Sequence, residues 1–198
     1  MTLPLAQLLR ANQGATVVEF ALVAPALMVL LMGLMDLAHS MYTAQMLQGA
    51  VQGAARDSTI EGATSIDDQL DANVTRAVRA VAPGATLAFG RMAYATFSSV
   101  SRPEDFTDAD DDGTCNNGEV FEDVNGNDTW DADQGMAGMG GGRDAVLYTV
   151  TVTYRRPFPV AALIPGQTAD NTFVVNTVLR NQPYGASAMA APTTANCT

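Results

Sequence analysis

The sequence predicts an α+β protein: a long N-terminal transmembrane helix that extends into a small exported domain with a second helix, an antiparallel sheet and an acidic calcium-type loop insertion. Three observations support this prediction. Residues 15–35 form an apolar run whose only ionisable side chain is Glu19. Residues 146–154 alternate strictly between two sets of side chains, which is typical of a strand. Residues 104–133 are rich in carboxylates and contain no Lys or Arg.

The first helix is predicted to run without interruption from Ala15 to Arg56. An apolar run of about 20 residues crosses a bilayer at 1.5 Å per residue. Pro25 can bend such a helix without ending it, because neighbouring helices satisfy the freed carbonyl. Gly49 and Gly53 lie four residues apart, a spacing that lets a partner helix approach closely; the alternative is a surface helix that tolerates glycine. Beyond the apolar run, one helix face is predicted from steps of three and four at Leu37, Met41, Ala44, Leu47, Gln48, Val51, Ala54 and Ala55.

Glu19 is the exceptional residue of this helix, because a carboxylate inside a bilayer costs on the order of 3 kcal/mol. If the chain were cut after Gly14, the new α-amino group on Ala15 would supply a cation. Two unit charges about 4 Å apart attract by roughly 4 kcal/mol at an effective dielectric near 20, so a pair between neighbouring subunits would offset the cost. The alternatives are a plain signal-anchor helix with an incidental Glu and a secretory signal peptide, whose apolar core is shorter.

Residues 14–20 (GATVVEF) resemble the processing site of type IV-like prepilins, in which a membrane peptidase cuts after Gly and the Glu at mature position five pairs with an adjacent subunit's amino terminus. Residues 47–57 (LQGAVQGAARD) resemble the TadE-like group of tight-adherence (Tad) pilus proteins, whose helix ends in Ala-Ala-Arg. The resemblance is specific over residues 14–56 and looser over the later strands. It implies a TadE- or TadF-type minor pseudopilin, cleaved by prepilin peptidase between Gly14 and Ala15. Such a protein assembles with other pilins or pseudopilins through its N-terminal helix.

We expect the chain to divide into a leader at 1–14, an anchor and assembly helix at 15–57, an exported domain at 58–182 with the calcium-loop insertion at 104–135, and a flexible tail at 183–198. The formal charge of −11 argues against a nucleic-acid partner, which requires basic patches. Arg10 precedes the apolar run and Asp36 follows it. This asymmetry predicts a cytoplasmic amino terminus and an exported body. The resemblance implies a single pass through the inner membrane and incorporation in a surface pilus.

The exported domain is predicted to contain one helix and three strands. The helix runs from Ser65 to Val81, with an apolar stripe and a Pro-Gly pair after it. The strands are predicted at Leu87 to Phe97, with a bulge near Gly90, and at Val146 to Tyr154 and Phe173 to Leu179. They would form a small antiparallel sheet with a helix packed on one face.

Residues 108–119 match the twelve-residue calcium pattern D-x-D-x-D-G-x5-E at every required position. Calcium takes six to eight oxygen ligands, and alternate side chains of such a loop converge on one point while Gly113 permits the sharp turn. The predicted ligands are Asp108, Asp110, Asp112, the carbonyl of Thr114, Asn116 through water, and Glu119.

The same pattern recurs fifteen residues later in degraded form, with aspartate at position 128 where glycine belongs and Gln134 at the closing position. We expect a weaker site with ligands Asp123, Asn125 and Asn127, and with Asp131 or Asp133 as substitutes. The flanking residues do not resemble EF-hand helices, so calcium loops without the full hand are predicted. The alternative is a disordered acidic insertion.

Cys115 and Cys197 are the only cysteines, and in an exported protein such a pair favours a disulfide; the alternative is that Cys197, near the chain end, stays free. No catalytic site is predicted, because the one histidine, His39, lies just beyond the apolar run. A calcium-assisted hydrolase is the enzyme alternative. The apolar segment Pro157 to Pro165 is interpreted as core or as a turn near the membrane, or else as an exposed partner-binding patch.

Together these features predict a structural minor pseudopilin that takes part in assembly or priming of a Tad-type pilus, with a calcium-stabilised exported domain. The alternative is a membrane-anchored extracytoplasmic calcium-binding or adhesion module unrelated to pili.

Overall fold

The computed structural model describes residues 13–57, 67–181, 186–189 and 191–198. Most of the predicted leader, and the predicted helix start at Ser65, lie outside these residues. The chain forms two compact units. The helix unit comprises Met1–Tyr42 and Arg155–Asn171, and the sheet unit comprises Thr43–Tyr154 and Thr172–Thr198.

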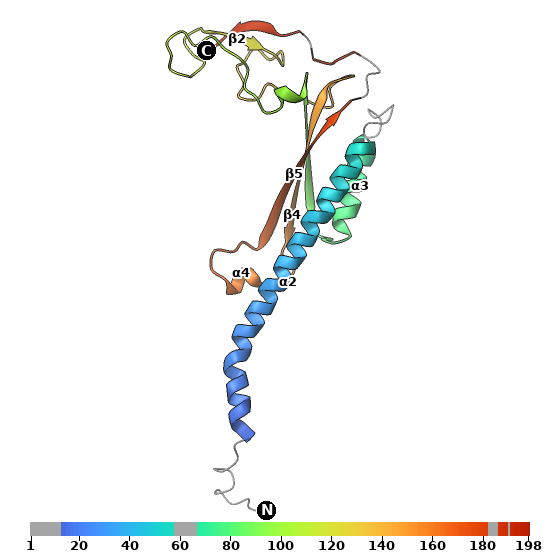
Figure 1. Cartoon of the computed structure of the whole chain (residues 1–198), viewed down its shortest axis with the longest axis vertical. Helices are drawn as coiled ribbons and strands as arrows, with labels where there is room; N and C mark the ends of the chain where they lie inside the picture. The colour runs from blue at the N-terminus through green and yellow to red at the C-terminus, as the bar shows by residue number, and fades with distance from the viewer. Residues whose placement is uncertain (1–12, 58–66, 182–185, 190) are drawn as a thin grey trace, which may run out of the picture. The chain divides into compact units, whose positions relative to one another are not determined.

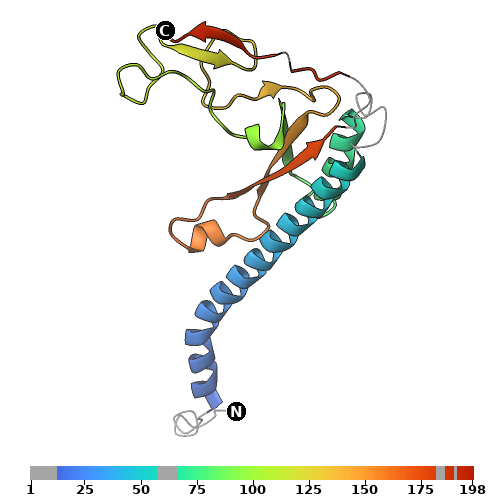
Figure 2. The same ribbon diagram turned by 45° about the horizontal axis from the view of Figure 1, so that its top comes forward.

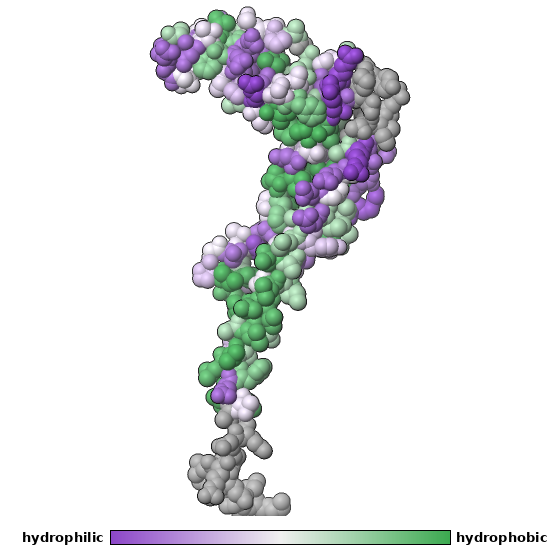
Figure 3. Space-filling view, viewed as in Figure 1, coloured by the Kyte–Doolittle hydropathy of each residue, from purple (hydrophilic) through white to green (hydrophobic). Residues whose placement is uncertain are grey.

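Helix α2 (Gln13–Asp57) is 45 residues long and confirms the single long helix predicted from the sequence (Figure 1). It continues through Pro25. It is long and apolar enough to cross a membrane, and most of the large apolar side chains between Val17 and Met35 are exposed. Figure 3 shows the resulting hydrophobic surface over the N-terminal half of α2. An apolar surface around the whole circumference of an uncovered helix is typical of a membrane span.

The remainder of the helix unit is the segment Arg155–Asn171 with the single-turn helix α4 (Val160–Leu163). The ends of this segment are joined where Arg156 donates its backbone N–H to Ala169 at 2.9 Å. The Arg156 guanidinium forms an ion pair with Asp36 of α2. The segment is therefore attached to the helix immediately after the apolar run.

The main sheet has the strand order β3 (Met136–Ala137), β1 (Thr86–Tyr94), β4 (Ala145–Arg155), β5 (Asp170–Arg180). Strands β1 and β4 are antiparallel in one constant register from Thr86 opposite Thr153 to Tyr94 opposite Ala145. The bulge predicted near Gly90 is wrong, because Gly90 lies directly opposite Thr149 within that register. Strand β1 ends at Tyr94, and the predicted strand end at Phe97 instead begins a short 3-10 helix, Phe97–Ser99.

The core of the sheet unit lies between one face of this sheet and two helices, the C-terminal part of α2 and α3 (Asp67–Arg79) (Figure 2). The alternation of β4 is reflected in its burial, because Val146, Tyr148, Val150, Val152 and Tyr154 are buried. The buried residues of α2 in this core are Leu47, Val51 and Ala54. Leu37, Met41 and Gln48, predicted on the same face, are exposed, so that predicted face is wrong in its first turn and at Gln48.

A second, two-stranded sheet pairs β2 (Val120–Asp123) with β6 (Thr193–Asn196) in antiparallel register. The C-terminal residues were expected to form a flexible tail, and β6 instead lies in ordered structure. Four polar or small residues, Thr-Thr-Ala-Asn, carry no apolar alternation that would have predicted a strand.

Candidate functional site

The residues of the predicted processing and assembly site are accessible on α2. Gly14 and Glu19 are both exposed. Within the described residues, no ion pair involves Glu19. Gly49 and Gly53 are exposed as well, and a Cβ added at either would meet no atom within 4 Å. The helix therefore presents a carboxylate near its start and a smooth surface of small residues near its end.

The first acidic loop folds around its leading aspartate. Asp108 accepts backbone N–H groups from Asp112 at 3.2 Å and from Gly113 at 2.8 Å. Asp112 accepts the N–H of Thr114 at 2.7 Å. Carboxylate oxygens of Asp108, Asp110 and Asp112 all lie within 4.8 Å of one another. The three side chains that the pattern predicted as ligands therefore do converge.

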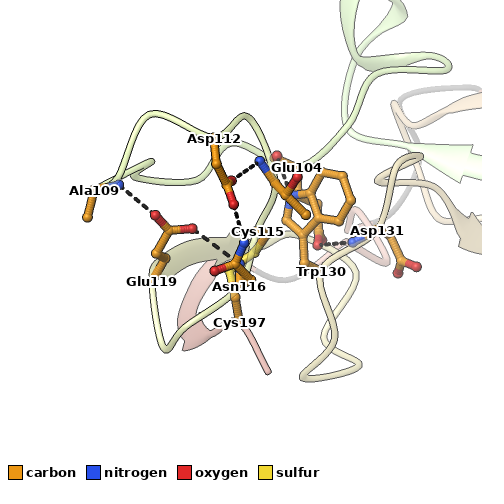
Figure 4. The surroundings of a disulfide bond; sticks show 10 residues. Glu104, Ala109, Asp112, Cys115, Asn116, Glu119, Trp130, Asp131 and Cys197 are labelled. Carbon is orange, nitrogen blue, oxygen red and sulfur yellow. Dashed lines mark hydrogen bonds between the residues drawn. A yellow bond between two sulfur atoms is a disulfide. The ribbon is translucent and has the colours of Figure 1, made fainter.

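Glu119 closes this loop from its far end. It is 7% exposed, and its two oxygens accept N–H groups from Ala109 at 2.6 Å and from Asn116 at 3.2 Å (Figure 4). The amide of Asn116 donates to Asp112 at 2.8 Å. Its Oδ1 is buried and accepts no hydrogen bond from the described residues. An oxygen in this position is available to a water or a cation.

The second loop repeats the backbone of the first. Asp123 accepts N–H groups from Asn127 at 3.1 Å and Asp128 at 3.0 Å, and Asn127 accepts from Thr129 at 2.8 Å. The fourth and sixth loop positions have positive φ in both copies. These angles are 59° at Asp111 and 75° at Gly113 in the first copy, and 75° at Gly126 and 59° at Asp128 in the second. Asp128 thus adopts the left-handed conformation that the pattern assigns to glycine, which aspartate tolerates better than most residues.

Glu104 supplies the closing carboxylate that the second loop lacks in sequence. It is 1% exposed, and its oxygens accept the N–H groups of Val124 at 2.8 Å and of Asp131 at 3.0 Å. These donors are the second and ninth loop residues, the same positions that donate to Glu119 in the first loop. Gln134, at the expected closing position, donates its backbone N–H to Arg102 at 2.9 Å.

The two copies are related by a local two-fold arrangement. Phe106 forms an antiparallel bridge with Phe121, fifteen residues later. Two backbone hydrogen bonds flank it, from the Thr107 N–H to Val120 and from the Glu122 N–H to Asp105, each at 2.8 Å. The two donor residues of this pair of bonds are fifteen positions apart in sequence, and so are the two acceptor residues. Glu104 was not predicted as a ligand because the calcium pattern places the closing glutamate at the end of its loop, whereas the fifteen-residue period aligns Glu104 with Glu119.

The two aspartates proposed as substitute ligands have different surroundings. Asp131 accepts the side-chain amides of Asn125 at 2.8 Å and Asn127 at 2.7 Å. Asp133 accepts the hydroxyl of Tyr94 at 2.9 Å. Burial, together with this hydrogen bond and the charge of Asp133, raises the pKa of Tyr94 to about 12. Asp131 is therefore the better placed of the two to join the loop ligands.

Cys115 and Cys197 form the predicted disulfide, which joins the eighth residue of the first loop to the end of β6 (Figure 4). Two backbone hydrogen bonds lie beside it, from the Gly118 N–H to Cys197 at 3.1 Å and from the Cys197 N–H to Glu119 at 2.7 Å. The C-terminal strand is thereby attached to the first loop.

Comparison with known proteins gives one match. Residues 14–56 match the model of the TadE-like protein family, which agrees with the resemblance of those residues. No curated protein and no solved structure matches the chain. The matched residues begin at Gly14 and end at Arg56, so they cover most of α2.

Proposed function

We propose that this chain, whose residues 14–56 are TadE-like, is a minor pseudopilin that takes part in assembly or priming of a Tad-type pilus. The observation that carries the proposal is the position of Gly14 and Glu19. The family match starts at Gly14, and Glu19 is an exposed carboxylate five residues later on an otherwise apolar helix surface. Cleavage by prepilin peptidase creates an α-amino group on Ala15, which pairs with Glu19 of a neighbouring subunit and fixes the register of the helices.

In this proposal the protein resides in the inner membrane with a cytoplasmic amino terminus and an exported sheet unit. Its partners are other pilins or pseudopilins, which pack along α2. The open surface at Gly49 and Gly53 supports such packing, because glycine lets two helix backbones approach closely. The role is structural and involves no catalytic group.

The mature amino terminus tests this proposal. The full chain, carrying a C-terminal tag, is produced with and without a prepilin peptidase and its intact mass is measured after extraction from membranes. We expect the mass to correspond to a chain that begins at Ala15 only when the peptidase is present. Gly14→Val should block cleavage, and Gly33→Val, a matched change inside the apolar run, should not. A chain that still begins at Met1 in the presence of the peptidase would overturn the proposal.

The paired loops favour a second function, and we propose that each binds one Ca²⁺ ion that stabilises the exported domain. The first site uses Asp108, Asp110, Asp112, the Thr114 carbonyl and Glu119, with Asn116 acting through water. The second uses Asp123, Asn125, Asn127, the Thr129 carbonyl, Asp131 and Glu104. The equivalent hydrogen bonds of Glu104 and Glu119 support this assignment, because both carboxylates are held at equivalent positions of two loops with the same backbone. Such oxygen-rich sites suit calcium.

Titration calorimetry of the full chain in detergent with calcium chloride tests the second proposal. We expect two sites with dissociation constants on the order of 10⁻⁴–10⁻³ M, as in extracellular modules. Calcium at about 100 times the dissociation constant should stabilise the fold by about 2.7 kcal/mol per site. Absence of both heat and thermal stabilisation at millimolar calcium would refute calcium binding. It would leave the pseudopilin proposal standing, whereas an unprocessed chain that binds calcium would favour a membrane-anchored calcium-binding or adhesion module.

A further inference from the structure

The segment Pro157–Pro165 of the helix unit presents apolar side chains on its outside. Residues 157–169 include no Asp, Glu, Lys or Arg, although Arg155, Arg156 and Asp170 flank them. Val160 is buried, and Leu163 is 47% exposed. Three prolines in nine residues are exposed as well. An apolar surface of this kind in an exported protein needs an occupant.

The segment contacts α2 at Asp36. Asp36, ion-paired with Arg156, is only 5% exposed. One turn earlier, a Cβ added at Gly33 would meet no atom within 4 Å, so the segment leaves Gly33 uncovered. Neighbouring side chains on other faces remain exposed, with values of 57% at Leu30 and 56% at Leu34.

The contact lies where the apolar run ends. The run ends at Met35, and its length of about 20 residues matches a hydrocarbon core of about 30 Å. Asp36 then lies at the outer edge of the hydrocarbon. A segment held to Asp36 by Arg156 is therefore at the interface of the outer leaflet, where interfacial elements bury their apolar side chains by about 5–10 Å.

We propose that Pro157–Pro165 inserts into the outer leaflet of the membrane that α2 spans, with Leu163 in contact with lipid and Arg155 at the level of the headgroups. The occupant is lipid because the exposed Leu163 belongs to a segment that the Arg156–Asp36 ion pair fixes at the end of the exposed apolar run of α2. The Arg156–Asp36 ion pair holds the segment against the helix at this depth. The inference rests on the proposed function in that it requires α2 to span a membrane.

The backbone of the segment suits a region with little water. Pro157, Pro159 and Pro165 lack an N–H group, so three donors that would need a partner are absent. Within α4 the N–H groups of Ala162 and Ile164 donate to Pro159 at 3.1 Å and to Val160 at 2.8 Å. With the N–H of Val160, which donates to Phe158 at 2.8 Å, three of the six N–H groups of the segment have backbone acceptors.

Depth-dependent fluorescence quenching tests the inference. Both native cysteines are in the disulfide, so Leu163→Cys introduces a single reactive thiol for an NBD dye. The labelled full chain is reconstituted in vesicles of phosphatidylcholine and phosphatidylglycerol at a ratio of three to one. Matched variants are Leu22→Cys, 77% exposed within the apolar run, and Val174→Cys, 59% exposed on β5. Quenching by lipids spin-labelled at a shallow or a deep acyl position is compared with quenching by aqueous iodide.

We expect shallow spin-labelled lipid to lower the emission at position 163 by about twofold and iodide to have little effect there, while position 174 shows the reverse. Iodide quenching at 163 equal to that at 174 would overturn the inference. So would protection from both quenchers that increases with the protein-to-lipid ratio, because it would identify a second copy of the chain as the occupant. Loss of lipid quenching at position 22 would instead show that the membrane-spanning part of the proposed function fails.

Discussion

Glu104 and Glu119 make equivalent hydrogen bonds in two successive acidic loops. Each accepts one N–H from the second residue of its loop and one from the ninth, at distances between 2.6 and 3.2 Å. Both are almost fully buried. Glu119 follows its loop in sequence, whereas Glu104 precedes its loop by nineteen residues. The Phe106–Phe121 bridge allows Glu104 to close the second loop, because it places the segment before the first loop alongside the second.

The first prediction concerns Glu104→Gln. Glutamine keeps the shape of the side chain and removes its charge, so calcium should bind the second loop at least about tenfold more weakly while the first loop is unchanged. Calorimetry should resolve this as the loss of one of two sites. Glu119→Gln should weaken the first loop instead. Glu122→Gln, which changes an exposed glutamate between the two loops, should alter neither site. If Glu104→Gln left both sites intact, Glu104 would have only a structural role.

Helix α2 could be predicted from the sequence, whereas the place of Glu104 in the second loop could not. Helix α2 and strand β4 were predictable because each carries its own periodicity within neighbouring residues. The first loop was predictable because its ligands occur within twelve residues. Glu104 contacts a loop that begins nineteen residues later, and Arg156 pairs with Asp36 across 120 residues of sequence. Such contacts depend on how the chain returns on itself, which local patterns do not encode.

The second prediction concerns the Asp36–Arg156 ion pair. Its side chains are 7% and 15% exposed, so Arg156→Met leaves a buried carboxylate without its counter-charge and should cost on the order of 3 kcal/mol. Hydrogen exchange of the amides of residues 155–171 in the detergent-solubilised chain should become faster. Arg155→Met, a matched change at the adjacent exposed arginine, should have little effect. The double variant Asp36→Asn/Arg156→Met should recover part of the lost stability because no unpaired charge remains. Equal hydrogen-exchange rates in Arg156→Met and Arg155→Met would contradict this account.

The third prediction concerns the disulfide. Cys115 and Cys197 are separated by 82 residues, and a cross-link of that span contributes about 4 kcal/mol in the chain-entropy description. Cys197→Ser should therefore lower the thermal stability of the sheet unit and release β6 from β2. The backbone N–H groups of Gly118 and of residue 197 form the hydrogen bonds beside the disulfide. Faster hydrogen exchange of these two amides would report that release. Reduction of the unmodified chain with dithiothreitol should reproduce the effect, and an unchanged melting temperature in both cases would disprove it.

The fourth prediction concerns acid stability through Asp144, which is 1% exposed. Burial raises the pKa of this carboxyl, but hydrogen bonds from the Ser187 hydroxyl and from the backbone N–H groups of Gly141, Ala188 and Met189 outweigh burial, and the pKa lies below its usual value. A folded-state pKa that is lower than the unfolded one means that the unfolded chain binds the proton first.

The contribution of Asp144 to stability is therefore fully present above the unfolded pKa of about 3.9, and it is lost as the pH falls through the lower folded value. Asp144→Asn should destabilise the fold at pH 7, where the amide cannot accept the same set of donors, by on the order of 1–3 kcal/mol. The difference in melting temperature between variant and parent should shrink steadily from pH 5 downward. Asp170→Asn, at an exposed position, serves as the control because the pH profile of its melting temperature should follow that of the parent. A gap between Asp144→Asn and the parent that stays constant from pH 7 to the acid limit would mean that Asp144 stabilises the fold by packing and not through its ionised form.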